Sequence, residues 1–442
     1  MMSTGERVLT YVAPSEAALN SAFRDGYSVI CGLNVEHLIE AARAALRLHK
    51  TAAPNGIRIL AHGAYNKVFL IEFGSTSLIA RVPLPQSAAA RDPIRLKSYT
   101  ATLEFMALYR PDVPVPRILS AQPSSANPAD VPYTLAEFCK GTSIAHLEWL
   151  NMPNTSKGII VDLLAEQWAK MAAPVPFNAL GSIMADGPST SSWMWQGRSA
   201  PQRTFRIIPM IPRYAHDSTT LLDPSMETRC GPTTIAEHWH YHLDAARHSI
   251  ANIPPDDDEK HLFVQCLDTL RELVNIASSL DPLMDLGKGS AAPGVALMHV
   301  DFAFWRNVLF SADRTRIEGI VDWDDAIVVP RDIAAQYPEE LTHHAWPPDP
   351  ADVFAIPPGT LFEDTSFWRL SIEETHLRKR FRDALRKFDP ELAALYTDRR
   401  ARFRRRVDHL VTQGWRYWAM DIDWILNTAM DEARALSQNG TV

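Results

Sequence analysis

Residues 295–330 read VALMHVDFAFWRNVLFSADRTRIEGIVDWDDAIVVP, and this stretch decides how the remainder of the chain is interpreted. Its first two apolar runs, Val295–Val300 and Val308–Phe310, are rich in Val, Leu, Met and Phe and too short for helices. They therefore predict short β-strands. A third apolar run, Ile317–Val321, follows the turn-like segment Ser311–Arg316, so that the stretch predicts a β-hairpin at the centre of the fold.

Polar side chains gather at the ends of these predicted strands. His299, Asp301 and Asn307 lie around the first loop, and Asp322 follows the third run. A hairpin with carboxylates at both ends suits a hard cation, because Mg²⁺ prefers oxygen ligands and usually shares them with substrate phosphates. Taken alone, Asp301 and Asp322 could equally be loop carboxylates that cap turns. His299 could simply bond to backbone groups.

Composition bounds the class of protein. The chain has 442 residues, of which 46% are hydrophobic and 22% charged, which is typical of a globular protein with two or three domains or lobes. The net charge of −8 argues against a nucleic-acid partner. No stretch resembles a signal peptide or a membrane span, so no membrane association is expected. The four cysteines form no CxxC pair, which favours reduced thiols in a cytoplasmic protein.

The first third of the chain predicts an antiparallel sheet. Asn34 is expected to cap a helix, and Arg58–Pro85 reads as three strands separated by turns. A helix over Thr100–Tyr109 and strands over Arg117–Ala121 and Tyr133–Phe138 complete a lobe of roughly 90 residues. Glycine in the first turn lets backbone amides approach a phosphate, although a plain hairpin turn is the alternative.

From Gly141 onward the pattern is mainly helical. We therefore predict two domains, residues 1–140 and residues 141–442, with a short strand at Phe205–Ile208 in the second. Predicted helices cover Ile159–Met171, Thr234–Ala245, Leu262–Leu280, Arg331–Glu340, Glu373–Phe388, Pro390–Leu410 and Trp415–Leu436.

A histidine run and an arginine run are interpreted as structural rather than as binding sites. His238, His240 and His242 would share one face only in a strand, and the surrounding pattern is helical, so a zinc site is disfavoured. The basic run Arg399–Arg406 is expected to be the solvated face of an amphipathic helix.

An ordered set of short motifs carries a resemblance to a known family. The chain resembles the aminoglycoside phosphotransferase and choline kinase-like small-molecule kinases, most closely their fungal branch, over roughly residues 34–440. The motifs are Gly63–Phe69, Ala80–Pro83, Glu104, Val115-Pro116, Ala136–Phe138 with Gly141, Leu180-Gly181, Gly231-Pro232, His299–Asp301, Asn307–Leu309 and Ile320–Trp323 with Pro330.

The resemblance implies an α+β, bilobal, protein-kinase-like fold with ATP between an N-terminal sheet lobe and a larger helical lobe. It implies that Asp301 accepts or orients the proton of a hydroxyl on a small-molecule substrate, that His299 braces the loop, and that Asn307 and Asp322 hold Mg²⁺. The residues implied to bind the nucleotide are Gly63, Ala64, Tyr65, Asn66, Arg81, Glu104, Glu137, Phe138 and Cys139. Among them, Glu104 is expected to pair with Arg81, and the backbone of Glu137 to Cys139 to bond adenine.

Two departures from the family pattern motivate a second hypothesis. Asp301 and Asn307 are six positions apart where the family has five, and Arg81 stands where lysine is usual. The alternative function is a pseudokinase-type nucleotide-binding or scaffolding protein. Kinase chemistry on a protein hydroxyl is disfavoured, because no DFG triplet or APE-like segment follows Asp322. For the acceptor, Asp332, Glu339 and Glu340 are candidates for attracting a cationic amine.

Overall fold

The computed structural model describes residues 8–9, 32–62, 65–85, 87, 90, 92–186, 204–211, 224–254, 259–281, 294–342, 350–361 and 365–438. The chain divides into two compact units. The first comprises residues 1–140 with 183–206 and 215–228, and the second comprises residues 141–182, 207–214 and 229–442. Among the described residues, no helix is both long enough and apolar enough to span a membrane.

A six-stranded antiparallel sheet forms the first unit, in the order β1-β2-β3-β4-β6-β5. Its strands are β1 (Val8–Leu9), β2 (Gly56–His62), β3 (Asn66–Phe73), β4 (Thr76–Pro83), β5 (Ile118–Gln122) and β6 (Tyr133–Glu137). The β3–β4 hairpin closes in two residues because Gly74 adopts a φ of +61°, which favours glycine.

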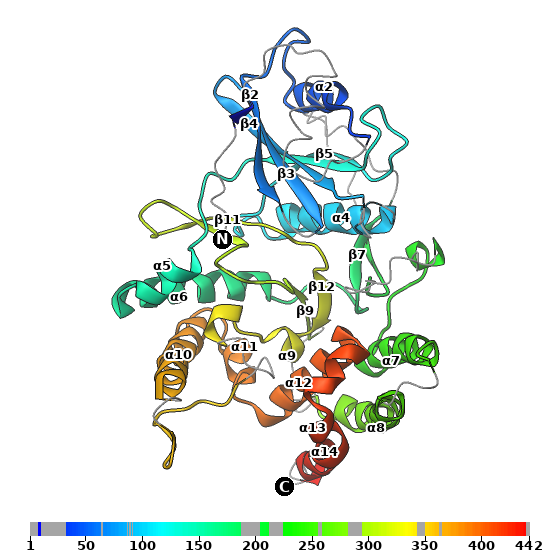
Figure 1. Cartoon of the computed structure of the whole chain (residues 1–442), viewed down its shortest axis with the longest axis vertical. Helices are drawn as coiled ribbons and strands as arrows, with labels where there is room; N and C mark the ends of the chain where they lie inside the picture. The colour runs from blue at the N-terminus through cyan, green and yellow to red at the C-terminus, as the bar shows by residue number, and fades with distance from the viewer. Residues whose placement is uncertain are drawn as a thin grey trace. The chain divides into compact units, whose positions relative to one another are not determined.

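Two helices flank these strands (Figure 1). Helix α2 (Val35–Ala45) starts at Asn34, whose side chain accepts the N–H of His37 as predicted, and it buries Leu38 and Ala42 in the apolar core of the sheet. Helix α4 (Pro93–Tyr109) begins seven residues before the predicted start, since Pro93 at its first turn already has a helical φ. The 3-10 turn η1 (Pro224–Glu227) and a β7–β8 ladder (Ser182–Ala185 with Phe205–Ile208) follow later in the chain.

Helices dominate the second unit, which confirms the predicted α+β architecture. The helices are α5 (His146–Asn151), α6 (Asn154–Met171), α7 (Ile235–Ala251), α8 (Lys260–Ser278), α9 (Arg331–Ala334), α10 (Thr365–Leu385), α11 (Pro390–Leu395), α12 (Arg399–Gln413), α13 (Ile422–Asn427) and α14 (Ala429–Gln438), with 3-10 turns η2 (Glu339–Leu341) and η4 (Trp415–Met420). Helix α12 packs against α7, α8 and α9 (Figure 1).

Two short ladders, rather than one hairpin, occupy residues 295–330. Strand β10 (Val308–Phe310) pairs with β11 (Ile317–Ile320), whereas β9 (Val295–Met298) pairs with β12 (Ile327–Pro330). The last strand was not predicted. Its pairing partner lies across the whole β10–β11 hairpin, so no local turn signal marks it.

Some predicted helices are broken by local caps. The helix predicted over residues 390–410 is two helices, because Asp398 accepts the N–H of Ala401 and starts α12 afresh. The helix predicted over residues 331–340 ends at Ala334, since Pro338 cannot continue it and η2 begins instead.

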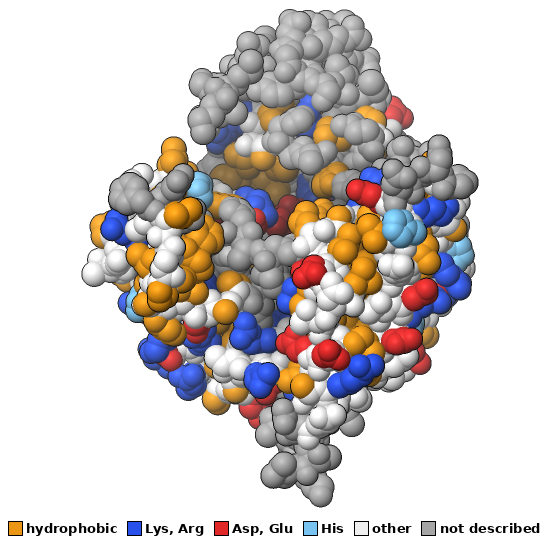
Figure 2. Space-filling view, turned by 60° about the horizontal axis from the view of Figure 1, so that its bottom comes forward, with side chains coloured by type: hydrophobic (Ala, Val, Ile, Leu, Met, Phe, Trp, Pro, Cys, Tyr) orange, Lys and Arg blue, Asp and Glu red, His pale blue; other side chains and the backbone are white. Residues whose placement is uncertain are grey.

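The prediction that the basic run is a solvated face is wrong for two of its arginines, whereas Arg399 is exposed. Arg404 and Arg405 are 0% and 2% exposed. Arg404 forms a buried ion pair with Asp332, with its Nε 2.6 Å from the carboxylate, and Arg405 donates to the Asp332 carbonyl. Elsewhere, on the face drawn in Figure 2, basic and acidic side chains lie interspersed.

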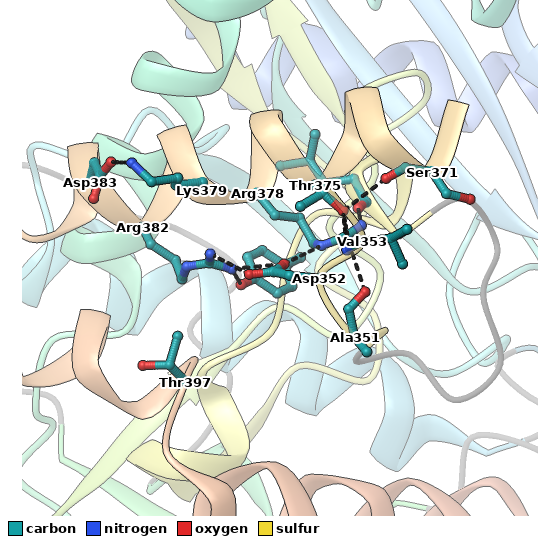
Figure 3. Close-up of polar contacts among 12 residues, drawn as sticks. Ala351, Asp352, Val353, Ser371, Thr375, Arg378, Lys379, Arg382, Asp383 and Thr397 are labelled. Atoms are coloured by element: carbon teal, nitrogen blue, oxygen red, sulfur yellow. Dashed lines mark hydrogen bonds and ion pairs between the residues drawn. The ribbon is translucent and has the colours of Figure 1, made fainter. Parts of the chain in front are cut away.

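The strand-free segment 350–361 is fastened to helix α10 (Figure 3). Arg382 binds Asp352, with 2.7 Å between Nη2 and the carboxylate. Thr375 accepts the N–H of Val353 at 3.0 Å, and Arg378 donates to the Ala351 carbonyl at 3.3 Å. Buried guanidinium groups on one helix face therefore hold a chain segment that has no ladder of its own.

Candidate active site

The β10–β11 ladder brings two predicted metal ligands to the same end of a hairpin. Val308 pairs with Ile320, and beyond this pair the Val321 N–H donates to the Asn307 carbonyl at 2.8 Å. Asp322 follows directly and is exposed. Its φ of +62° lies in the left-handed region, which Asp tolerates better than most residues and which redirects the chain at this point.

The loop from Asp301 to Asn307 absorbs its additional residue in one helical turn. The Ala303 N–H bonds the Asp301 carbonyl at 2.9 Å, and the Asn307 N–H bonds the Ala303 carbonyl at 2.8 Å. The Asn307 side chain then donates to both the carbonyl and the carboxylate of Asp301, at 2.7 and 2.8 Å. The six-residue spacing therefore does not separate these two side chains.

Arg306 binds the Asp301 carboxylate and was not singled out from the sequence. Its guanidinium contacts both carboxylate oxygens of Asp301 and also reaches Glu339. Burial acts to raise the pKa of the Asp301 carboxyl. The hydrogen bonds and charge of Arg306, with the bond from Asn307, outweigh burial and hold that pKa below its usual value. The position of Arg306 directly before Asn307 was the sequence signal that could have identified it as part of the site.

His299 is buried and bonded on both ring nitrogens. Its Nδ1 accepts the Asp301 N–H at 3.3 Å, and its Nε2 donates to the Val321 carbonyl at 2.9 Å. The ring also packs edge-on against Trp323, with 4.6 Å between centroids. These contacts tie the residue before Asp322 to the start of the loop. They support the predicted role of His299 as a brace.

A pocket of about 340 Å³ opens beside Asp301 within the second unit. Its lining includes Trp168, Met210, Tyr337, His409 and Gln413. Its volume falls in the range of small-molecule sites, which combine apolar walls with a few polar groups. The pocket residues from α12 were not predicted from the sequence. Polar residues at positions 409, 412 and 413 of a largely buried helix could have indicated a polar cavity there.

The predicted phosphate loop is only partly described. Gly63 and Ala64 lie outside the described residues. Tyr65 is 48% exposed, and its carbonyl accepts the Leu84 N–H at 2.7 Å. Asn66 begins β3 opposite Pro83 and is buried. These two residues thus stand at the open end of the β3–β4 hairpin.

Arg81 and Glu104 are buried polar residues of the first unit, each 6% exposed. Arg81 lies on β4, where it pairs with Val68, and its guanidinium stacks 4.6 Å above the Tyr99 ring. Glu104 lies on α4. Their pairing with one another stays a prediction.

The predicted adenine-binding segment, residues 137–139, begins with the last residue of β6. The Glu137 N–H donates to the Arg117 carbonyl at 3.0 Å, and Arg117 also bonds the Glu137 carboxylate. The amide of Glu137 is thus occupied, which leaves adenine binding in this segment to other backbone groups. Phe138 and Cys139 are half-buried beside it.

The three acidic residues expected to attract a cationic amine have partners within the protein. The expectation is wrong for Asp332, because this residue is completely buried against Arg404. Glu339 lines the pocket but binds Arg306. Glu340 is 6% exposed and accepts the N–H of Trp305 at 2.9 Å. In the described part of the chain, no cluster of three or more His, Cys, Asp or Glu side chains could hold a metal.

With this geometry in view, the sequence places the chain in a family of enzymes. The model of the phosphotransferase enzyme family matches residues 56–331, more than half of the chain, so the chain belongs to that family. This confirms the resemblance inferred from the motifs and assigns the protein to the phosphotransferases.

Individual relatives are distant. Subtelomeric hrmA-associated cluster proteins from two strains of Aspergillus fumigatus are each 25% identical over an alignment of 339 residues. The alignment covers 67% of this chain and 63% of the relatives' length. A crystal structure of aminoglycoside phosphotransferase APH(4)-Ia is 16% identical, with a TM-score of 0.44, covering 92% of this chain and 99% of that one. The GDP complex of aminoglycoside 2'-phosphotransferase-IIIa is 13% identical, with a TM-score of 0.39 and the same coverage.

Proposed function

We propose that the protein is an ATP- and Mg²⁺-dependent kinase that phosphorylates a hydroxyl group of a small molecule. The observation that carries the proposal is the hydrogen-bonded pair Asp301–Asn307 at the edge of a pocket of small-molecule size, in a chain of the phosphotransferase family. In related phosphotransfer sites, catalysis is mostly positioning and charge stabilisation.

Asp301 is assigned to the acceptor. The hydroxyl oxygen forms a bond to the γ-phosphorus of ATP while the bond from that phosphorus to the bridging oxygen breaks, and ADP leaves. The proton of the hydroxyl passes to Asp301. Because the pKa of this carboxyl is lowered, Asp301 is ionised before the reaction and first orients the hydroxyl, and it takes the proton only late, as the new bond to phosphorus forms.

Asn307 and Asp322 are assigned to Mg²⁺, which neutralises phosphate charge when bound. The amide nitrogen of Asn307 is committed to Asp301, so its oxygen is the atom that is oriented for a cation. With the exposed carboxylate of Asp322, this gives two oxygen donors at one hairpin end. Two protein ligands suit Mg²⁺, since it usually keeps waters and phosphate oxygens as well.

The first unit is assigned to the nucleotide. Arg81 carries a permanent positive charge for the phosphates, and the segment 137–139 offers backbone groups to adenine. A cytoplasmic location belongs to the same proposal. It is supported by Cys230 and Cys266, which form no disulfide.

Replacing Asp301 by Asn tests the assignment. Phosphate transfer from radiolabelled ATP should fall by at least about 100-fold, while Mg²⁺–ATP should still raise the melting temperature. Asp313→Asn is the matched control, because Asp313 is an exposed carboxylate in the turn of the same hairpin and should leave turnover unchanged. Full turnover in Asp301→Asn would remove Asp301 from the mechanism.

One observation supports a second candidate function, that of a nucleotide-binding scaffold with impaired catalysis. Both carboxylate oxygens of Asp301 are engaged, by Arg306 and Asn307, which would hinder a proton acceptor. A Mg²⁺-dependent thermal shift with ATP, accompanied by no transfer to water or to any of a panel of hydroxyl compounds, would favour this scaffold.

A further inference from the structure

The 3-10 turn η2 is bonded to the loop that contains Asp301. The Glu339 N–H reaches the Phe302 carbonyl at 3.4 Å, and the Glu339 carboxylate binds the Arg306 guanidinium. The next residue, Glu340, accepts the backbone N–H of Trp305 at 2.9 Å. Two consecutive carboxylates of η2 thus bind two consecutive residues of the loop.

The Trp305 N–H lies within the turn that absorbs the additional residue. The neighbouring amides of Arg306 and Asn307 both donate to the Ala303 carbonyl, at 3.4 and 2.8 Å. The amide of Trp305 instead uses the side chain of Glu340. Leaving a partly buried backbone donor without an acceptor is unfavourable, so the shape of this turn depends on that side chain.

The surroundings of Glu340 favour a neutral carboxylic acid. The side chain is 6% exposed, and within the described structure its Oε2 has no hydrogen-bond partner. Glu339 and Arg306 are the charged groups that face it. Burial raises the pKa of the Glu340 carboxyl to about 8, with a further increase from Glu339, against the opposing effects of the Trp305 N–H and Arg306.

Helix α10 fixes η2 from the other side. Arg378 donates from Nη1 to the Leu341 carbonyl at 2.9 Å, and its Nη2 bonds Thr375 at 2.7 Å. Figure 3 shows this guanidinium between Thr375 and the Ala351 carbonyl. Glu340 is therefore attached to an anchored turn, and can position the loop rather than follow it.

We propose that Glu340 is a positioning residue that holds the loop of Asp301 and Asn307 through the backbone N–H of Trp305. The effect of Glu340 on catalysis rests on the proposed kinase function, whereas its contact with the loop does not. A protonated glutamic acid and a glutamine have the same shape and both present a neutral acceptor oxygen, so Gln should replace Glu340 without loss of the contact.

Hydrogen–deuterium exchange of residues 301–307, corrected for intrinsic rates, tests the hold directly. In the wild type, protection should be about tenfold higher near pH 7 than near pH 9. The bond from the Trp305 N–H is stronger to a carboxylate, but the closed loop then buries the charge of Glu340, and opening the loop lets water solvate that charge. Glu340→Gln should stay protected at both values, and Glu340→Leu should be about tenfold less protected at both. Glu374→Gln is the matched control, since Glu374 on α10 is equally buried, with a pKa also raised by burial to about 8. It should retain the wild-type pH dependence.

Turnover of Mg²⁺–ATP supplies a second readout. Glu340→Leu should lower kcat by about 10- to 100-fold with little change in KM for ATP, and Glu340→Gln should restore kcat and remove the decline near pH 9. Wild-type protection in Glu340→Leu, or an unchanged alkaline loss in Glu340→Gln, would overturn the proposal. Absence of turnover in every protein, including the wild type, would refute the kinase function and leave the exchange data to decide the role of Glu340.

Discussion

Replacing Asp332 by Asn should destabilise the second unit severely. Asp332 and Arg404 are both 0% exposed, with 2.6 Å between the Arg404 Nε and the carboxylate. Arg404 also donates to the carbonyls of Ala277 and Ser278, at 3.2 and 3.1 Å. Its guanidinium therefore bridges α9 to the end of α8, and the carboxylate is its charged partner within this set.

The expected loss in unfolding free energy is about 3–5 kcal/mol, because the buried guanidinium would keep its charge and lose its hydrogen-bonded counter-ion, although the charges of Asp281 and Asp408 still act on it. The matched control is Asp162→Asn. Asp162 binds Arg380 through two bonds of similar length, 2.9 and 2.7 Å, but both side chains are more than 40% exposed. Water replaces that partner, so the loss there should stay below about 1 kcal/mol.

Urea unfolding followed by tryptophan fluorescence measures both losses, because Trp239 is buried and lies near the Arg404 guanidinium. A double replacement, Asp332→Leu with Arg404→Met, removes both charges and should recover most of the stability. Equal losses for Asp332→Asn and Asp162→Asn would refute the reasoning, since burial would then make no difference to the cost of breaking the pair.

Two further changes test the packing of the same unit. Gly181→Ala should cost at least about 2–3 kcal/mol in a thermal melt, because its φ is +131° and a Cβ would lie 2.1 Å from the Ile208 carbonyl oxygen. Gly359→Ala, with positive φ but open space, should cost less, and equal costs would exclude the clash. Burial lowers the pKa of His242 to about 4, so the unfolded chain binds the proton first and stability should fall by up to about 3 kcal/mol from pH 6.5 to about pH 4. His242→Leu should remove the share of that pH dependence due to His242, while the buried neighbour His238, whose pKa burial also lowers, should keep a slope. An unchanged slope would assign the fall to other groups.

Local patterns were sufficient for strands β2 to β6 of the first unit and for the position of the loop from Asp301 to Asn307, whereas β1 was not predicted. Glycine-containing turns between alternating strands located β2, β3 and β4, and Asn34 located the start of α2. The two polar loops around the β10–β11 hairpin were also placed correctly. In each case the physical cause is a short-range one, since a cap or a turn is made by residues a few positions apart.

Contacts between residues far apart in the sequence could not be predicted from such local patterns. Arg404 was assigned to a solvated surface because neither Asp332 nor the carbonyls at the end of α8 are near it in sequence. The spacing between Asp301 and Asn307 raised the question whether the two side chains meet, and the folded loop brings them into a hydrogen bond. Glu340 was considered only as a charge, since its contact with the Trp305 amide requires the folded loop.

The backbone bridges of the second unit also govern the order in which it can be assembled during synthesis. Pro174 bridges to Ala296 and Gly181 to Val328, so each contact joins positions more than a hundred residues apart. Closing such loops costs entropy before any packing is gained, which makes folding slow. A nascent chain shorter than about 328 residues lacks at least one of these partners, so the backbone groups of Pro174 or Gly181 remain without their bridges until it is made. Chaperone dependence and poor yields from C-terminally shortened forms should therefore be features of this protein.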